Sequence, residues 1–255
     1  MKKNSNYLLR KSHRYLGLFL GIQFVFWTFG GLYFSWNNID KVHGDHLRNH
    51  TPLLTGNINL VSPDNALAQL KQKSKVDSII NLEVINVLGK PTYRITYLSN
   101  DKAEGEKVNI ALADGQKGDL RSELSKEEAI AIAESLYIPE SKIDRVEYIT
   151  EVDKHSEYRE KPLPAWAIFF DHPDSPAIYV GATSGTFEAV RHDTWRTFDF
   201  LWMLHTMDFE GRDQFGNKLL QAFSVLGLIT VLSGFVLFYI SSPTVRKWKK
   251  RLKKD

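Results

Sequence analysis

Two long uncharged stretches constrain this chain more than any other feature of its sequence. Residues 16–36 (LGLFLGIQFVFWTFGGLYFSW) and residues 219–240 (LLQAFSVLGLITVLSGFVLFYI) contain no Asp, Glu, Lys or Arg. A helix of about 20 residues is about 30 Å long, which is the hydrocarbon thickness of a bilayer. Each stretch therefore predicts a transmembrane helix, with Tyr33 and Trp36 as aromatic anchors at the far interface of the first.

Two alternatives compete with this interpretation. A basic start followed by an apolar run also fits a signal peptide. The first stretch, however, is longer than a typical signal core, is rich in aromatic residues and is not followed by an A-x-A cleavage site. The second alternative is a pair of buried helices in a soluble protein, but two separate uncharged stretches with basic flanks seldom arise that way.

Charge is unevenly distributed along the chain and predicts its topology. Residues 1–15 carry +5 and residues 241–255 carry +6; because the whole chain carries +3, residues 16–240 carry −8. Basic flanks beside apolar stretches mark the cytoplasmic side of a membrane. We expect a bacterial cytoplasmic (inner) membrane protein with both termini cytoplasmic and residues 37–218 extracytoplasmic. Its basic ends suit membrane lipids, and we expect no nucleic-acid partner.

Several classes of chemistry find no support in the sequence. The chain has no cysteine, which excludes disulfides, cysteine zinc sites, Fe–S clusters and thiol nucleophiles. It also lacks a G-x-S-x-G elbow, a P-loop, an H-E-x-x-H motif and a dinucleotide fingerprint. No acid–base pair stands out by its spacing. Enzymatic activity stays open, and the sequence favours a non-enzymatic role with no catalytic residues.

The region between the apolar stretches contains a weak duplication, residues 62–120 and 121–193. Each copy begins with a short helix, capped by Ser62 in the first copy and by an S-x-x-E box of Ser125 and Glu128 in the second. Strand-like segments follow at residues 82–87, 92–98, 108–112, 143–150, 165–170, 177–180 and 186–190. The expected fold class is α+β, with two transmembrane helices flanking an extracytoplasmic tandem of helix-plus-antiparallel-sheet units.

The other parts of the chain follow from these boundaries. Residues 1–15 form a cytoplasmic N-terminal tail, residues 37–61 a juxtamembrane linker, and residues 241–255 a basic cytoplasmic tail. Residues 194–218 form an interfacial amphipathic segment. Its first part, TWRTFDFLWMLHTM, has the aromatic and aliphatic residues of a helix that lies in the headgroup region.

Short motifs at corresponding places suggest a known family. Residues 177–190 (AIYVGATSGTFEAV) look like the closing strand and turn of a PepSY domain. His13, followed by Arg-Tyr-Leu-Gly, is similar to a His before an aromatic and Leu-Gly at the start of that family's first helix. Leu204-His205 before the last helix, and Ser233-Gly234-Phe235 inside it, also fit. In this order along the chain, they resemble the PepSY-associated transmembrane family, which carries tandem PepSY domains between membrane helices.

The resemblance implies two functions of different classes. PepSY domains are similar to protease-propeptide inhibitory modules, which implies a non-enzymatic binding or regulatory component of the envelope, in iron or siderophore uptake. Sheet edges would then contact another envelope protein, or a second copy of the chain in a homodimer. Larger relatives resemble ferric-siderophore reductases, which implies instead a haem- or metal-binding membrane redox component.

Haem would need axial ligands, and His13 and His205 are the candidates for haem b. No histidine lies inside residues 16–36 or 219–240, so the paired intramembrane histidines of a b-type cytochrome are not present in the apolar stretches. The expected topology puts His13 and His205 on opposite membrane faces, so a single haem would need the same residue from two chains. The alternative is that each interfacial histidine binds a phospholipid headgroup or a backbone carbonyl.

A second group of histidines, His43, His46 and His50, follows the first apolar stretch with the spacing H-x2-H-x3-H. If the helix continues outward, these positions share one face and three imidazoles could hold a transition metal such as Zn²⁺, Cu²⁺ or Fe. Gly44 and Asp45 weaken the assumption of a continuous helix. A polar juxtamembrane linker explains the same residues without a metal.

Overall fold

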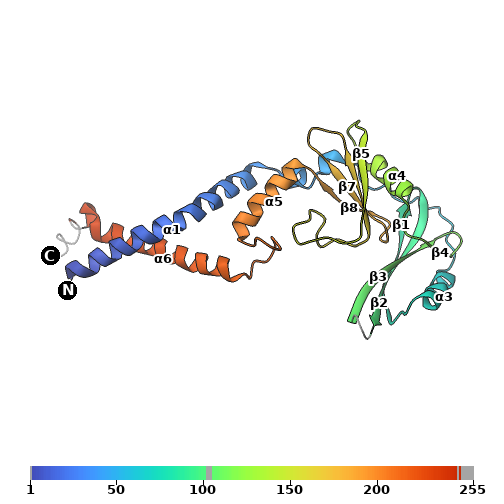
Figure 1. Cartoon of the computed structure of the whole chain (residues 1–255), viewed down its shortest axis with the longest axis horizontal. Coiled ribbons are helices and arrows are strands. Elements are labelled where there is room, and N and C mark those ends of the chain that lie inside the picture. The colour runs from blue at the N-terminus through green and yellow to red at the C-terminus, as the bar shows by residue number, and fades with distance from the viewer. Residues whose placement is uncertain (1, 102–104, 246, 248–255) are drawn as a thin grey trace. The chain divides into compact units, whose positions relative to one another are not determined.

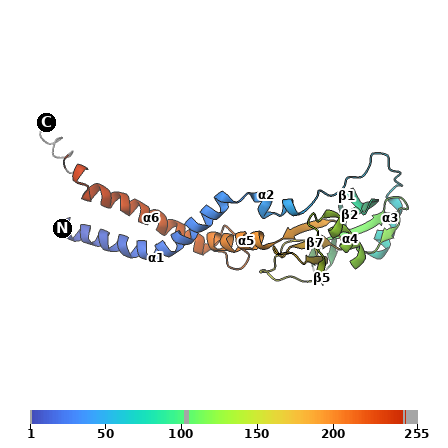
Figure 2. The ribbon, with the colours of Figure 1, turned by 90° about the horizontal axis from the view of Figure 1, so that it is seen from above.

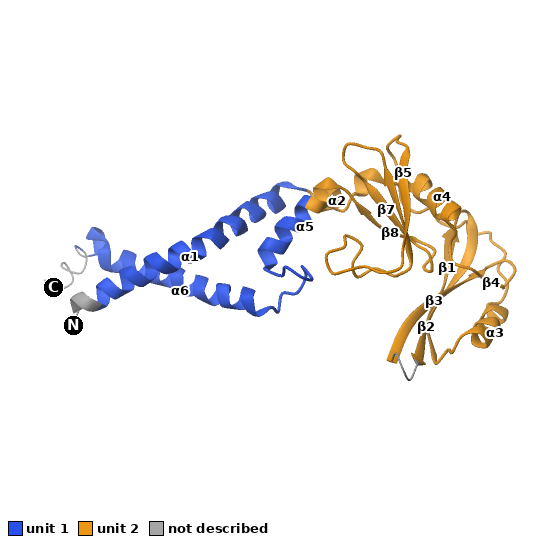
Figure 3. Cartoon of the chain, viewed as in Figure 1, with its two compact units in different colours: residues 1–37, 197–255 blue, residues 38–196 orange. Residues whose placement is uncertain are grey.

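A computed structural model of the chain describes residues 2–101, 105–245 and 247, which form two compact units (Figure 3). Residues 1–37 and 197–255 make up the helical unit, and residues 38–196 make up the sheet unit. Most of the expected basic tail at residues 241–255 lies outside the described residues. The fold as a whole is α+β, as the sequence predicts.

The helical unit contains two long apolar helices, α1 (Lys2–Trp36) and α6 (Lys218–Ser241), and the C-terminal part of α5 (Asp193–Thr206). Both long helices have the length and composition to cross a membrane, and only 11% of each apolar window is buried. The core helix of a soluble protein is mostly buried, so this exposure favours helices that face lipid. α1 also begins well before residue 16, where the apolar stretch starts.

α1 and α6 pack against each other as an antiparallel pair (Figure 1, Figure 2). The rings of Phe19 and Phe223 lie 5.5 Å apart across this contact. A Cβ atom at Gly227 would lie 3.3 Å from the Phe24 ring. The glycine therefore allows a close approach that a larger residue would obstruct, as is common between membrane helices.

The sheet unit consists of two similar halves, each with one helix and one four-stranded antiparallel sheet in chain order. The first half contains α3 (Asp64–Lys73), β1 (Ser78–Val87), β2 (Lys90–Asp101), β3 (Gly105–Asp114) and β4 (Leu120–Arg121). The second half contains α4 (Lys126–Leu136), β5 (Ile143–Ile149), β6 (Ala165–Phe170), β7 (Ala177–Gly181) and β8 (Phe187–Arg191). The duplicated helix-plus-sheet arrangement expected from the sequence is therefore present in the structure.

One apolar core lies within the first half, and a larger one joins the two halves. α3 covers one face of the first sheet, where Tyr93, Ile95 and Tyr97 of β2 are buried beneath it. The opposite face of that sheet contributes Ile85 and other apolar side chains to a larger core. This second core also contains residues of α4 and of the second sheet, among them Ala133, Leu136, Ile168, Ile178 and Val180. Because both sheets share it, the two halves form one unit.

Local capping explains where the two short helices begin. Ser125 accepts a hydrogen bond from the Glu128 backbone, and the Glu128 carboxylate accepts one from the Ser125 backbone, so the expected capping box is confirmed. Ser62 is one residue too early to cap α3. Pro63 holds the N-cap position, and the Ser62 hydroxyl donates to the Asp64 carboxylate at 2.6 Å.

Part of the expected linker at residues 37–61 is packed into the sheet unit. It forms α2 (Ile39–Val42) and a short 3-10 helix, η1 (Asp45–Leu47). Val42 and Leu47 are buried, and Arg48 forms an isolated antiparallel bridge with Tyr137. α2 ends at Val42, so no continuous helix places His43, His46 and His50 on one face.

Candidate functional site

Strand β1 forms one edge of the first sheet and carries exposed apolar residues. It pairs with β2 and has no second neighbour among the described strands. Leu82 and Val84 lie opposite Ile95 and Tyr93 in the register, so they share the face that α3 covers. α3 does not reach them, and both side chains remain 38% exposed. An apolar strip therefore runs along the open edge.

This edge carries few of the features that usually block pairing with another strand. Natural edge strands are commonly protected by lysine, proline, bulges or inward charges. β1 reads SIINLEVINV, without lysine or proline. Its one charge, Glu83, is held by Arg94 at 2.9 Å. A bulge between Ile79 and Asn81 is the one interruption of its pairing with β2.

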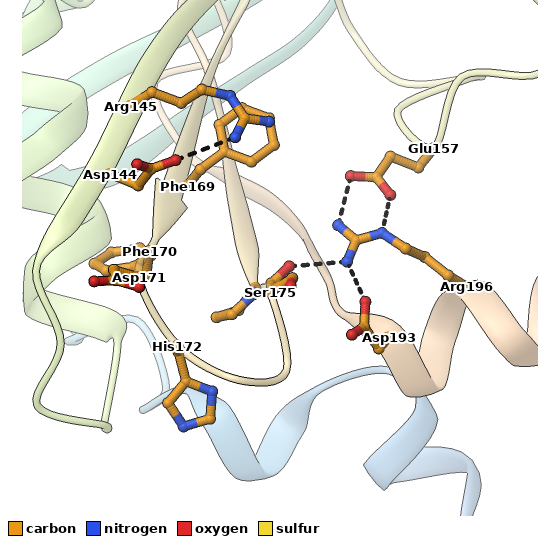
Figure 4. A pocket seen from close by; sticks show the side chains of 11 residues that line it. Asp144, Arg145, Glu157, Phe169, Phe170, Asp171, His172, Ser175, Asp193 and Arg196 are labelled. Carbon is orange, nitrogen blue, oxygen red and sulfur yellow. Dashed lines mark hydrogen bonds and ion pairs between the residues drawn. The ribbon is translucent and has the colours of Figure 1, made fainter.

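A polar pocket of about 630 Å³ lies in the second half of the sheet unit (Figure 4). Arg196 reaches into it from α5. Its guanidinium donates to both carboxylate oxygens of Glu157, at 2.8 and 3.1 Å, to Asp193 at 2.8 Å and to the Ser175 carbonyl at 2.8 Å. The positive charge of Arg196 is thus fully compensated by groups of the protein itself.

The other arginine of this pocket is compensated in the same way. Arg145 forms ion pairs with Asp144 at 3.2 Å and Glu147 at 2.8 Å, and its guanidinium stacks 3.6 Å above the Phe169 ring. Asp171 and His172 complete the polar lining. The lining holds four carboxylates and two arginines, so its net charge is negative, which suits an internal ion-pair network better than the binding of an anion.

In the helical unit, α1 and α6 are joined by a polar contact that involves His13. The Nδ1 atom of His13 lies 2.7 Å from the Ser233 hydroxyl, and a Cβ atom at Gly234 would lie 3.3 Å from the His13 ring. The sequence places His13 before the first apolar stretch, but its partner lies well inside the second. The motif that begins at His13 therefore contacts the motif Ser233-Gly234-Phe235.

α5 ends against α1 through two hydrogen bonds to its last carbonyls. The Gln23 side chain donates to the Leu204 carbonyl at 2.8 Å, and the Trp27 indole donates to the His205 carbonyl at 2.9 Å. A helix end leaves four carbonyls without partners in the helix. Gln23, one of the few polar residues in the first apolar stretch, therefore has a structural role that the sequence alone does not indicate.

His205 lies among three aromatic rings next to this helix end. Its ring centroid is 6.1 Å from Trp27, 5.9 Å from Phe34 and 6.1 Å from Trp202, to which it is nearly parallel. The Nδ1 atom is buried and has no hydrogen-bond partner among the described residues. An unsatisfied buried nitrogen is uncommon and marks His205 as a residue whose role packing alone does not explain.

His13 and His205 lie far apart along the axis of α1. His13 belongs to α1 itself, whereas His205 packs against Trp27, 14 residues further along. At 1.5 Å per residue this is about 21 Å along the helix axis. One chain cannot bring both imidazoles to a single iron.

The histidines after α1 separate in the structure. His46 packs against the buried His192, with ring centroids 5.5 Å apart. Partial desolvation, followed by the neighbouring His192 and Lys41, holds the pKa of His46 below its usual range. His43 ends α2 and His50 lies beyond η1. Within the described ranges, no three His, Asp or Glu side chains are grouped closely enough to hold a metal ion.

His192 is a residue that the sequence analysis missed. It is fully buried, with Nδ1 3.0 Å from the Asp174 carboxylate and Nε2 3.1 and 3.2 Å from the carbonyls of Lys41 and Val42. Both ring nitrogens therefore lie within hydrogen-bond distance of oxygen acceptors. His192 lies between β8 and α5, and nothing in the neighbouring sequence indicates its contact with the carbonyls of Lys41 and Val42.

A compact turn connects α5 to α6. The Asp208 carboxylate accepts hydrogen bonds from the backbones of Gly211 and Gln214, at 3.1 and 2.9 Å, and these bonds lower its pKa although burial alone would raise it. Arg212 forms a buried ion pair with Asp199 of α5. The acidic turn is thus ordered by internal bonds.

The fold and these sites define an α+β protein with two helices suited to a membrane and an edge strand open to pairing. Comparison of the chain with protein-family models, curated proteins and solved structures gives no match. The functional interpretation therefore depends on the residues described above.

Proposed function

We propose that this chain is a non-enzymatic binding component of the bacterial envelope, held in the cytoplasmic membrane by α1 and α6, and that it belongs to the PepSY-associated transmembrane proteins. Its sheet unit would lie outside the cytoplasm and bind an extended segment of another envelope protein. The resemblance suggests iron or siderophore uptake as its context.

The observation that carries this proposal is the open edge of β1. Main-chain hydrogen bonds to an added strand give affinity, and alternate side chains of that strand give specificity. Leu82 and Val84 supply an apolar strip beside the buried Tyr93 and Ile95. A partner segment with apolar residues at every second position would extend the sheet and cover this strip.

Site-specific photo-crosslinking in intact cells tests the proposal. A photoreactive residue at position 82 should give a discrete product with another protein, and the Leu82→Lys/Val84→Lys variant, crosslinked from position 80, should lose it. Position 138 is the matched control, because Ile138 is 51% exposed and lies outside the strands, after the end of α4. Equal labelling from positions 82 and 138, or a product with twice the mass of the chain, would contradict a heterologous partner on this edge.

The proposed topology has its own test. A reporter that is active only outside the cytoplasm should be active when fused after residue 120 and inactive when fused after residue 255. The basic flanks at both chain ends support this orientation. The opposite pattern would contradict the placement of the sheet unit.

A second candidate function is haem or metal binding in a membrane redox component, and the environment of His205 favours it. Haem iron is commonly held by histidine. The fit is partial, since Nδ1 of His205 is enclosed by protein and Nδ1 of His13 is engaged by Ser233, which leaves Nε2 of each residue as the ligating atom. A bis-histidine site would need a second chain.

The visible spectrum of the detergent-purified protein distinguishes this candidate. A Soret band that disappears in His205→Ala or His13→Ala, but persists in His155→Ala, would support haem ligation. A colourless, iron-free protein from haem-replete cells would exclude it. The crosslinking result at β1 does not depend on this outcome.

A further inference from the structure

A basic pocket in the sheet unit differs from the polar pocket in how its charges are balanced. It encloses about 380 Å³ between the segment after α2, strand β8 and the start of α5. The side chains that define it here are His43, Arg48, Lys161, Phe187, Arg191 and Trp195. All of them belong to the sheet unit.

Arg191 is positioned without a carboxylate in contact. Its guanidinium stacks 4.1 Å above the Trp195 ring, Nε donates to the Glu157 carbonyl at 2.8 Å and Nη1 to the Val190 carbonyl at 3.0 Å. These partners are neutral. Burial lowers the pKa of Arg191 to about 10, against the opposing effect of the Glu157 carboxylate, and the side chain is still cationic at neutral pH. An anion beside it would restore the solvation that burial removes.

Two further cations line the same pocket. The Arg48 guanidinium lies 4.5 Å above the Phe187 ring and donates to Asp45 at 2.8 Å. Lys161 has no hydrogen bond or ion pair of its ammonium group among the described residues. The guanidinium groups of Arg48 and Arg191 each stack on an aromatic ring, which holds them in place. Their N–H groups lie in the plane of the guanidinium and point away from the ring axis.

The carboxylates of the pocket are already engaged. Asp45 is bound by Arg48, and Glu188 accepts hydrogen bonds from the hydroxyls of Ser184 at 2.5 Å and Thr186 at 3.3 Å. With three cations and two carboxylates, the lining has a net positive charge. The contrast with Arg196 is direct, because that residue has both Glu157 and Asp193 as partners.

We propose that this pocket binds a phosphate group, either free or as an ester, through Arg48, Lys161 and Arg191. Guanidinium groups match the oxygen spacing of phosphate, and lysine supplies a point charge. The volume is several times the roughly 30 Å³ that one water molecule occupies, which leaves room for a small esterified group. Phospholipid headgroups and soluble phosphates share this chemistry.

Isothermal titration of the full-length protein in neutral detergent with inorganic phosphate, at constant ionic strength, tests the site. We expect saturable binding, about tenfold weaker in Lys161→Gln, because a charge-assisted contact is lost. Lys161→Gln removes no hydrogen bond among the described residues and should fold normally. Lys126→Gln, on the exposed first turn of α4, makes the same charge change elsewhere and should bind like the wild type.

Variants of the arginines separate this site from general charge attraction. Arg48→Gln should also weaken phosphate binding, and combination with Lys161→Gln should weaken it further. No saturable binding to the wild type, or an equal loss in Lys126→Gln and Lys161→Gln, would overturn the proposal. Thermal unfolding of each variant without phosphate shows whether a lost signal reflects a lost fold, and a folded Lys161→Gln protein keeps the test decisive.

The two sources of phosphate are distinguished by parallel titrations. Soluble dihexanoyl-phosphatidylglycerol carries the phosphodiester of a lipid headgroup, and inorganic phosphate carries none of its glycerol or acyl groups. Tighter binding of the short-chain lipid, still dependent on Lys161, would assign the site to a headgroup. Tighter binding of inorganic phosphate would assign it to a soluble ligand. Binding of both probes that is independent of Lys161 would contradict the site itself.

Discussion

His13 Nδ1 and Ser233 Oγ lie 2.7 Å apart and join α1 to α6 across 220 residues of sequence. The Arg10 side chain reaches the Ser241 hydroxyl at 3.4 Å in the same helix pair. Arg10 thus lies level with the end of α6, whereas His13 lies level with its interior. If α6 crosses a bilayer, His13 is a polar group in an apolar surrounding, where such residues are rare and usually paired.

The first prediction is that His13 and Ser233 are energetically coupled. Hydrogen bonds between membrane helices contribute about 0.6 kcal/mol on average and at most about 1.7 kcal/mol. A double-mutant cycle with His13→Ala and Ser233→Ala, measured by unfolding in detergent, should give a coupling in this range. Ser224 serves as the control. Its hydroxyl donates to the Leu220 carbonyl of its own helix, as that of Ser233 donates to Thr230, but among the described residues it is Ser233 that also bonds to His13. Equal coupling of His13 to Ser224 and Ser233 would mean that the contact has no specific effect.

Seven of the eight described strands could be predicted from sequence because their signals are local, whereas the two-residue β4 (Leu120–Arg121) has no such signal. The segment at residues 165–170 matches β6, and the capping box of Ser125 and Glu128 marks the start of α4. Alternation and capping both depend on residues within a few positions of each other. The α+β class follows from them together with the two apolar stretches.

The candidate sites could be predicted less well because they depend on distant contacts. His13 finds Ser233 only through the pairing of α1 and α6, and Gln23 finds Leu204 only because α5 returns along α1. The helix that a metal site at His43 and His46 would require does not form, because Gly44 adopts φ +79°, and a Cβ atom there would lie 2.7 Å from Val190. That packing partner is nearly 150 residues away, so periodicity carries no trace of it.

The second prediction concerns the end of α5. Gln23→Leu removes the donor to the Leu204 carbonyl without adding charge, so the last turn of α5 should open more often. Hydrogen exchange should become faster in residues 204–217, while residues 126–136 of α4 keep their protection. Thr28→Ala is the control, because Thr28 bonds to Phe24 in its own helix. Unchanged exchange in Gln23→Leu would show that water or Trp27 is sufficient for this helix end.

The third prediction concerns the ion pair of Asp199 and Arg212. Asp199 is 4% exposed and Arg212 is 18% exposed, so removing one partner leaves an uncompensated buried charge. Asp199→Asn should lower the free energy of unfolding by about 3–5 kcal/mol, whereas Asp199→Leu/Arg212→Leu should recover most of that loss. Thermal unfolding in detergent measures both. Glu134→Gln, an exposed carboxylate on α4, should have little effect, and a double variant less stable than Asp199→Asn would contradict this account.

The last prediction links His46 to the pH dependence of stability. Partial desolvation, followed by the neighbouring His192 and Lys41, lowers its pKa in the folded protein, although Asp174 and Asp45 act in the opposite direction. The unfolded chain then binds more protons than the folded one below the ordinary value of roughly 6.5, so stability falls as pH drops through that value and levels off below the folded pKa. In His46→Gln, the unfolding temperature should fall less than that of the wild type between pH 7.5 and pH 5. His50→Gln, an exposed substitution on the same segment, should follow the wild type. If the unfolding temperature of His46→Gln changes with pH as steeply as that of the wild type, the other groups around His192 set the pH dependence.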